Sequence, residues 1–318
     1  MEAHTQQLLD SKQSAIYTAI TPGRTQDSPH TKTTMGIKSN DKSLWWYFAV
    51  AYAFTWACWI PNALVAHGVA FPAGWTAFLA GPLNPAAFGP FVAAFTLTFL
   101  QQGARGVLQL LQRGIDFRFK KIWLAAILLL PCVLFGGSIW VAALAGFRPI
   151  DLSVVSNPPY ALIAFFVILF TAGPLQEEFG WRGYALPRLQ SRFNALASSI
   201  ILGFFWWLWH LPAVFIPGRF MTDNLVVFLS LLVVITLASI LFTWIYNNTN
   251  GSILAAILTH NSMNWSIWLA MPDMKMDLAA SGFMIGFLAI AVLVIIKIWG
   301  AEHLCREHGP AQLQATRL

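Results

Sequence analysis

Long apolar stretches constrain this chain more than any other feature of its sequence. A helix needs about 20 mostly apolar residues to cross roughly 30 Å of hydrocarbon. Eight such stretches run approximately over residues 44–66, 77–100, 123–145, 160–186, 196–215, 225–246, 252–271 and 279–299. Only 10% of the 318 residues are charged, whereas a soluble domain has roughly 25%. The sequence therefore predicts an all-α, polytopic membrane bundle of about eight transmembrane helices, and it excludes an ordinary soluble domain.

Both ends of the chain differ in composition from this apolar middle. Residues 1–43 are rich in Ser, Thr, Gln, Lys and Asp, and such a segment cannot bury enough surface to offset the entropy of ordering. We expect a disordered cytoplasmic tail there, a transmembrane domain over residues 44–300 and a short cytoplasmic tail over residues 301–318. No early apolar core precedes a small-residue cleavage site, so we expect no secretory signal.

The positions of Lys and Arg predict an orientation in the membrane. Cytoplasmic loops carry an excess of these residues, and an even number of spans puts both termini on one side. With a cytoplasmic N-terminus, basic residues concentrate in the tails and in the second-to-third and fourth-to-fifth connections, whereas the outer connections hold only Arg148, Arg219 and Lys275. Orientation thus accounts for the formal charge of +6, and we expect the lipid bilayer as a partner but no nucleic acid.

The connection over residues 103–121 alternates basic and apolar residues at helical spacing. This pattern is typical of a helix that lies in the headgroup layer. A solvated linker is the alternative.

Six polar side chains interrupt the apolar stretches where ionisable groups cost about 2.5 to 3.5 kcal/mol each at mid-helix. They are Glu177, Glu178, Arg182, His210, His260 and Asn264. Glu178 and Arg182 are four residues apart and can pair on one helical face, as can His260 and Asn264. If the fourth helix ends just before Pro187, then Glu177, His210 and His260 fall in a shared inner-to-middle layer of the membrane. Taken singly, the acids could belong to a loop end and each histidine could be satisfied by a neighbour.

Together, these groups could hydrolyse a peptide bond. A glutamate kept from bulk water can act as a general base on a water molecule, imidazoles can orient that water or bind a metal, and an asparagine amide can stabilise an oxyanion. His210, His260 and Glu177 would make an acceptable zinc shell with an open position, but they would serve equally in a metal-free glutamate mechanism. The HExxH motif of common zinc proteases is missing from the sequence.

Three motifs resemble those of the CAAX-protease and bacteriocin-processing family of intramembrane endopeptidases, also called CPBP or Abi. EExxxR matches Glu177, Glu178 and Arg182, HxxxN matches His260 and Asn264, and FxxxH falls on Trp206 to His210. Trp206 stands where the family usually has Phe, which puts packing more than chemistry in doubt. The resemblance is specific over residues 174–265.

This resemblance implies a helical bundle around a polar chamber and an intramembrane metalloendopeptidase activity. Glu177 would activate the water, Glu178 and Arg182 would order Glu177, His210 and His260 would position the water or hold a metal, usually supposed to be zinc, and Asn264 would stabilise the oxyanion. The substrate would be a peptide or a lipidated protein. Two alternatives stay open, a scaffold or immunity protein without activity and a proton-coupled transporter. The sequence does not distinguish substrates or oligomeric states.

Overall fold

The computed structural model describes residues 42–80 and 85–306, and within these ranges it contains helices and no strands. Residues 1–41 of the predicted N-terminal tail and residues 307–318 of the predicted C-terminal tail lie outside the described residues, whereas Ser43 is already helical. The predicted all-α class is confirmed for the part that is described.

Helices follow one another with short connections. The α-helices are α2 (Ser43–Ala66), α3 (Ala73–Ala80), α4 (Gly89–Arg113), α5 (Ile122–Pro131), α6 (Gly137–Leu144), α7 (Pro158–Thr171), α8 (Pro174–Gly180), α9 (Leu186–Gln190), α10 (Ala195–Trp209), α11 (Leu225–Asn248), α12 (Ile253–Ala270) and α13 (Leu278–Trp299). The 3-10 turns are η1 (Pro85–Phe88) and η4 (Leu211–Phe215), and the π turns are η2 (Cys132–Gly136) and η3 (Trp181–Ala185).

Polar side chains define where five of these helices begin. In each of these helices a side-chain oxygen of the preceding residue accepts a hydrogen bond from a backbone N–H in the first turn. The capping residues are Asn157 for α7, Asn194 for α10, Asn224 for α11, Ser252 for α12 and Asp277 for α13. The first N–H groups of a helix have no partner within it, and a capping oxygen supplies one. The helix boundaries therefore follow from short polar signals between apolar stretches.

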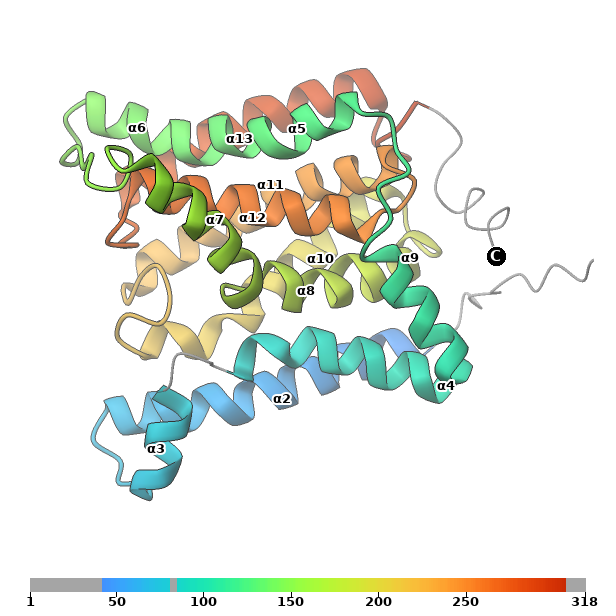
Figure 1. Cartoon of the computed structure of the whole chain (residues 1–318), viewed down its shortest axis with the longest axis horizontal. Helices are drawn as coiled ribbons and strands as arrows, with labels where there is room; N and C mark the ends of the chain where they lie inside the picture. The colour runs from blue at the N-terminus through green and yellow to red at the C-terminus, as the bar shows by residue number, and fades with distance from the viewer. Residues whose placement is uncertain (1–41, 81–84, 307–318) are drawn as a thin grey trace, which may run out of the picture. The chain divides into compact units, whose positions relative to one another are not determined.

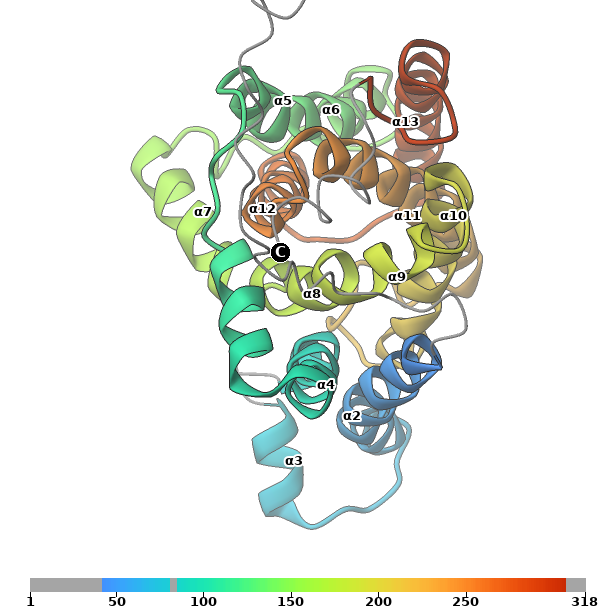
Figure 2. The ribbon, with the colours of Figure 1, turned by 90° about the vertical axis from the view of Figure 1, so that its right-hand side faces the viewer.

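Helix α12 occupies the centre of the bundle. It packs against α5, η2, α7, α8 and α11, and Figure 2, which views the helices nearly end on, shows it enclosed by α5, α7, α8 and α11. Two further pairs, α2 with α4 and α10 with α11, pack side by side (Figure 1). Because its neighbours shield α12 on several sides, this helix can carry the polar sequence THNSMN at membrane depth.

The expected number of eight spans is not confirmed, although the fold is polytopic and helical. Among the residues that the structure describes, five helices are long and apolar enough to cross a membrane, or up to six if the bent pair α7 and α8–α9 counts as one span. The predicted span over residues 77–100 is divided among α3, η1 and α4, in a region rich in Pro and Gly. The span predicted over residues 252–271 corresponds to α12, whose polar residues keep it outside this group.

The prediction that the fourth span ends before Pro187 is wrong. The helix is interrupted earlier, at Gly173, where α7 and the following helix meet at 40°. The helical path then continues through η3 into α9 as far as Gln190. Pro187 lies in the first turn of α9, directly after the π turn. A missing N–H is tolerated at such a starting position, and a π turn shifts the hydrogen-bond register just before it.

Residues 103–113 form the second part of α4, after a kink at Gly103, which has φ 65° and ψ −162°. The helix predicted in this connection is therefore confirmed up to Arg113, while residues 114–121 contain turns and no regular helix. Its placement in the headgroup layer stays a prediction.

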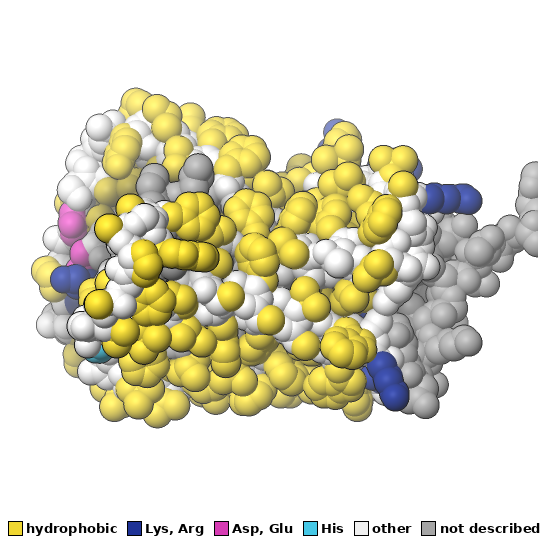
Figure 3. All heavy atoms as spheres, turned by 90° about the horizontal axis from the view of Figure 1, so that it is seen from below, with side chains coloured by type: hydrophobic (Ala, Val, Ile, Leu, Met, Phe, Trp, Pro, Cys, Tyr) yellow, Lys and Arg dark blue, Asp and Glu magenta, His cyan; other side chains and the backbone are white. Residues whose placement is uncertain are grey.

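The connections between helices gather at two ends. At one end, the Oγ of Ser252 donates to the carbonyl of Asp116 at 2.5 Å, and the Nδ2 of Asn247 donates to the carbonyl of His303 at 2.7 Å. At the other end, Arg148 lies 3.8 Å from Asp273 and 3.6 Å from Asp277. Figure 3 shows a broad band of hydrophobic side chains between the ends, with acidic side chains together with Lys or Arg at the left and Lys or Arg at the right.

Candidate active site

A buried network joins α8, η3 and α12. The Oε1 of Glu178 accepts hydrogen bonds from the Nη1 of Arg182 at 2.9 Å and from the Nδ1 of His260 at 2.8 Å. Glu178 and Arg182 have no exposed surface, and His260 is 3% exposed. The structure therefore contains the i,i+4 pair that the sequence predicted, and it adds a histidine from a helix 82 residues further along the chain.

Aromatic faces enclose the guanidinium group of this network. The Cζ of Arg182 lies 4.7 Å from the ring centroid of Trp206 and 4.7 Å from that of Phe242. A guanidinium group is weakly hydrated and stacks well on aromatic rings. Contact with these two adjacent rings, together with the Glu178 carboxylate, accommodates the positive charge of a guanidinium group that water does not reach.

Glu177 points to a different set of partners. Its Oε2 accepts a hydrogen bond from the indole Nε1 of Trp206 at 2.7 Å and a second one from the Nε1 of Trp181 at 3.2 Å. The residue lies in the first turn of α8 and is 5% exposed. Adjacent carboxylates on a helix point about 100° apart. One acid therefore joins the Arg182 network while the other faces the two indoles.

His210 follows the last residue of α10, and its Nδ1 lies 2.9 Å from the carbonyl oxygen of Trp206. A carbonyl oxygen only accepts, so Nδ1 carries the proton and Nε2 has the free lone pair in the neutral ring. The ring centroid lies 4.8 Å from Phe220 and 6.5 Å from Trp206. His210 is less buried than His260, so one of the two predicted histidines is partly open.

Asn264 is half-buried on α12, one turn beyond His260. Its Nδ2 donates to the carbonyl oxygen of Ala172 at 3.0 Å, at the break between α7 and α8. The next residue, Gly173, is close to the predicted base, because a Cβ added there would lie 2.2 Å from the Oε1 of Glu177. Asn264 therefore supports the backbone beside Glu177, and its second amide N–H is left for another acceptor.

The structure thus brings five of the six predicted residues around Trp206. This side chain bonds Glu177, lies against Arg182, and has its ring centroid 5.3 Å from that of His260. Its backbone carbonyl bonds His210. Glu178 joins the group through Arg182 and His260, whereas Asn264 lies at the helix break. Sequence reasoning assigned Trp206 only a packing role and missed Trp181 and Gly173, although both tryptophans lie inside the motifs.

A catalytic zinc ion takes three protein ligands and keeps one position open. Within residues 42–80 and 85–306, no group of three or more His, Cys, Asp and Glu side chains is placed to hold a metal ion. The hydrogen bonds of Glu177 and His260 use Oε2 and Nδ1, and they leave Oε1 and Nε2 as the atoms that would ligate a metal. As arranged, His210, His260 and Glu177 do not form a zinc shell, and Zn²⁺ binding stays a prediction.

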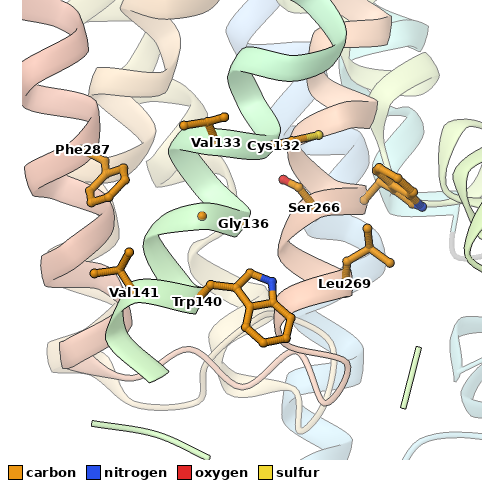
Figure 4. A pocket seen from close by; sticks show the side chains of 10 residues that line it. Cys132, Val133, Gly136, Trp140, Val141, Ser266, Leu269 and Phe287 are labelled. Atoms are coloured by element: carbon orange, nitrogen blue, oxygen red, sulfur yellow. The ribbon is translucent and has the colours of Figure 1, made fainter. Parts of the chain in front are cut away.

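A cavity of about 390 Å³ lies elsewhere, between the segment around η2 and helices α12 and α13 (Figure 4). Its lining is mostly apolar and includes Cys132, Gly136, Trp140, Ser266 and Phe287. None of the six predicted site residues lines it. This cavity is therefore separate from the cluster formed by Glu177, Glu178, Arg182, His210 and His260 around Trp206.

The fold and the cluster together define a class of protein. The chain is an integral, multi-pass helical membrane protein in which two acids from α8, an arginine from η3 and two histidines, one directly after α10 and one from α12, meet around one indole ring. Ionisable groups at such depth are costly, and they mark functional sites.

Comparison with known proteins agrees with this class. Residues 159–266 match the family model described as Type II CAAX prenyl endopeptidase Rce1-like. The segment contains all six predicted site residues, and over it the chain is similar to the CAAX protease family. A similar curated protein is CAAX prenyl protease 2 of Methanococcus maripaludis, which is 38% identical over 96 residues. That alignment covers 28% of this chain and 34% of the relative, so the chain spans about a third of the relative's length.

Proposed function

We propose that this protein is a membrane-embedded endopeptidase in which Glu177 activates a water molecule that hydrolyses a peptide bond. The observation that carries the proposal is the geometry of the Glu177 carboxylate. Two indole N–H groups hold its Oε2, while the neighbouring acid is committed to Arg182 and His260. One acid is thus fixed but retains an oxygen for proton transfer, which is what a general base requires.

The reaction would proceed through a tetrahedral intermediate. Glu177 takes a proton from water as the water oxygen bonds to the carbonyl carbon of the substrate. The protonated Glu177 then delivers that proton to the amide nitrogen, and the carbon–nitrogen bond breaks. His210 would orient the water through its Nε2, because its Nδ1 proton is committed to the Trp206 carbonyl.

Stabilising the oxyanion would fall to α12. Asn264 has a second amide N–H beyond the one bonded to Ala172. His260 donates its Nδ1–H to Glu178, so the Nε2 of its neutral ring is an acceptor and would orient the water together with His210. A donor held in place before the reaction lowers the barrier because no reorganisation is needed as charge develops. Glu178 and Arg182 would act by fixing His260.

The substrate we propose is a peptide attached to the membrane. The site residues lie on helices that are buried in the bundle, so a substrate must reach them from the lipid or from a bundle end. The similar protein of Methanococcus maripaludis is named a prenyl protease, which makes a prenylated C-terminal peptide the first substrate to test.

The experiment compares purified wild type, Glu177→Gln and Glu302→Gln in liposomes that contain a prenylated peptide or the same peptide without its lipid. We expect Glu177→Gln to lose cleavage by at least about 10³-fold, because an amide cannot accept the proton. Glu302 is exposed and far from the cluster, so its variant should cleave like wild type. Normal cleavage by Glu177→Gln would refute the mechanism. No cleavage by any form would favour a scaffold without activity.

A further inference from the structure

The proposed base is held unequally at its two oxygens. Both indole donors, Trp206 at 2.7 Å and Trp181 at 3.2 Å, bond the Oε2 of Glu177. In the described part of the chain, no hydrogen-bond donor reaches the Oε1 of this residue. The two oxygens therefore have different capacities to accept a proton, since Oε2 already accepts two hydrogen bonds.

The free oxygen faces the break between α7 and α8. Gly173 has φ 102°, a left-handed conformation that favours glycine, and its carbonyl accepts the backbone N–H of Glu177 at 2.8 Å. A Cβ at this position would lie 2.2 Å from Oε1. The space beside Oε1 thus exists because residue 173 has no side chain.

The indole that holds Oε2 is the same side chain that contacts the rest of the cluster. Trp206 lies against Arg182 and His260 with its ring, and its backbone carbonyl bonds the Nδ1 of His210. A phenylalanine would keep the ring contacts and the carbonyl, but it would lose the N–H. The chemical difference between the two residues at this position is therefore the hydrogen bond to Glu177.

We propose that Trp206 is a positioning residue that holds Glu177 through Oε2 and, with the open backbone at Gly173, leaves Oε1 as the oxygen that takes the proton from water. The inference rests on the proposed function for its consequence in catalysis. The division between the two oxygens is a property of the folded chain and can be measured without substrate.

Trp206→Phe is the central variant, and Trp207→Phe is its matched control. Trp207 is the next residue of α10, is also buried, and donates its Nε1–H to the carbonyl of Phe228 at 2.8 Å. Both variants thus lose one buried indole hydrogen bond from the same helix. Only the first one loses a bond to the proposed base.

The first measurement is steady-state cleavage of the peptide. We expect Trp206→Phe to lower kcat about tenfold or more with little change in KM, because a hydrogen bond to a charged group is lost while the aromatic volume is kept. Trp207→Phe should keep the wild-type kcat per folded molecule. Equal kcat values for the two variants would overturn the proposal.

The second measurement needs no activity. Dicyclohexylcarbodiimide reacts with carboxyl groups in membrane interiors, and mass spectrometry can follow its addition to Glu177 relative to the adjacent Glu178. We expect the Glu177 to Glu178 ratio to rise severalfold in Trp206→Phe, because Oε2 loses its shorter donor, and to stay at the wild-type value in Trp207→Phe. An unchanged ratio in Trp206→Phe would overturn the proposal even if the protein proved to be no protease. Should that variant fail to fold, Trp181→Phe removes the other donor and gives the same readouts.

Gly173→Ala tests the assignment of Oε1, with Gly146→Ala as the control. Gly146 also has a left-handed φ, 82°, but a Cβ there would meet nothing within 4 Å. Both variants carry the same kind of backbone strain, and only Gly173→Ala crowds Glu177. We expect kcat to fall at least tenfold in Gly173→Ala alone. Equal kcat in the two variants would contradict the role of Oε1.

Discussion

At the scale of single residues, Glu178 is the side chain on which the cluster depends for its charge balance. It is fully buried and bonds both Arg182 and His260. A buried ion pair gains little over an apolar pair, but removing one partner leaves an uncompensated charge. The pair is therefore needed for the position of His260 more than for the stability of the bundle.

A stability measurement distinguishes these two contributions. Arg182→Met should lower the free energy of unfolding in detergent by about 3 to 5 kcal/mol, because the Glu178 carboxylate is left without its cation. The double variant Glu178→Gln with Arg182→Met should recover part of that loss, since the unpaired charge is gone. Thermal unfolding of the single and double variants checks this. An Arg182→Met protein as stable as wild type would show that removing Arg182 does not leave a costly uncompensated charge on Glu178.

The sequence could predict the Glu178–Arg182 pair because its four-residue spacing lies within one helical stretch. It could not predict the hydrogen bond from Trp206 to Glu177, which joins residues 29 positions apart and depends on how α10 packs beside α8. Asn264 illustrates the same limit. Its position on the same helical face as His260 was predictable. Its hydrogen bond to the Ala172 carbonyl depends on the bend between α7 and α8, which no local sequence pattern indicated.

At the scale of helices, the site lies where regular structure is interrupted. The bend at Gly173 precedes α8, the π turn η3 follows it, and α10 ends just before His210. The sequence predicted continuous helices there, because the spans were located from the length of apolar stretches. An apolar stretch does not reveal a π turn, in which the hydrogen-bond register shifts by one residue. The interruptions also place α8 very close to its neighbours.

Gly180 marks this close approach and makes it testable. A Cβ on Gly180 would lie 2.5 Å from the Cβ of Pro90 on α4 and 2.5 Å from the hydroxyl oxygen of Tyr47 on α2. Gly180→Ala should therefore destabilise the protein by about 1 to 3 kcal/mol through overpacking. The control is Gly282→Ala in α13, where a Cβ meets nothing within 4 Å and should be neutral or stabilising by up to about 1 kcal/mol. Thermal unfolding in detergent that ranks the two variants the other way would contradict this packing.

At the scale of the whole described bundle, the two ends carry opposite charge. The end that holds residues 114–121, 188–195 and 302–306 carries mostly basic side chains, namely Arg118, Lys120, Lys121, Arg188, Arg192 and Arg306, with Asp116 and Glu302. The other end carries Arg148, Arg219 and Lys275 with Asp151, Asp223, Asp273 and Asp277. The sequence predicted this grouping from its apolar stretches, although its count of eight spans is not confirmed where Pro and Gly divide one.

This asymmetry predicts the orientation of the protein. Because Lys and Arg accumulate in cytoplasmic connections, we expect the end with Lys121 to face the cytoplasm and the end with Lys275 to face outward. Both side chains are exposed, so each can be replaced by cysteine in a chain whose Cys58, Cys132 and Cys305 are changed to alanine. A membrane-impermeant maleimide should label Lys275→Cys in intact cells.

Lys121→Cys should react with the same reagent only after the membrane is opened. Ser153→Cys serves as a second outward position, because it follows Arg148 in the same connection and is exposed. Its agreement with Lys275→Cys would establish that the two connections share a side, as the contacts of Arg148 with Asp273 and Asp277 require. Labelling of Lys121→Cys in intact cells would contradict the predicted orientation and show that this end faces outward. Glu177 would then be reached from the opposite leaflet.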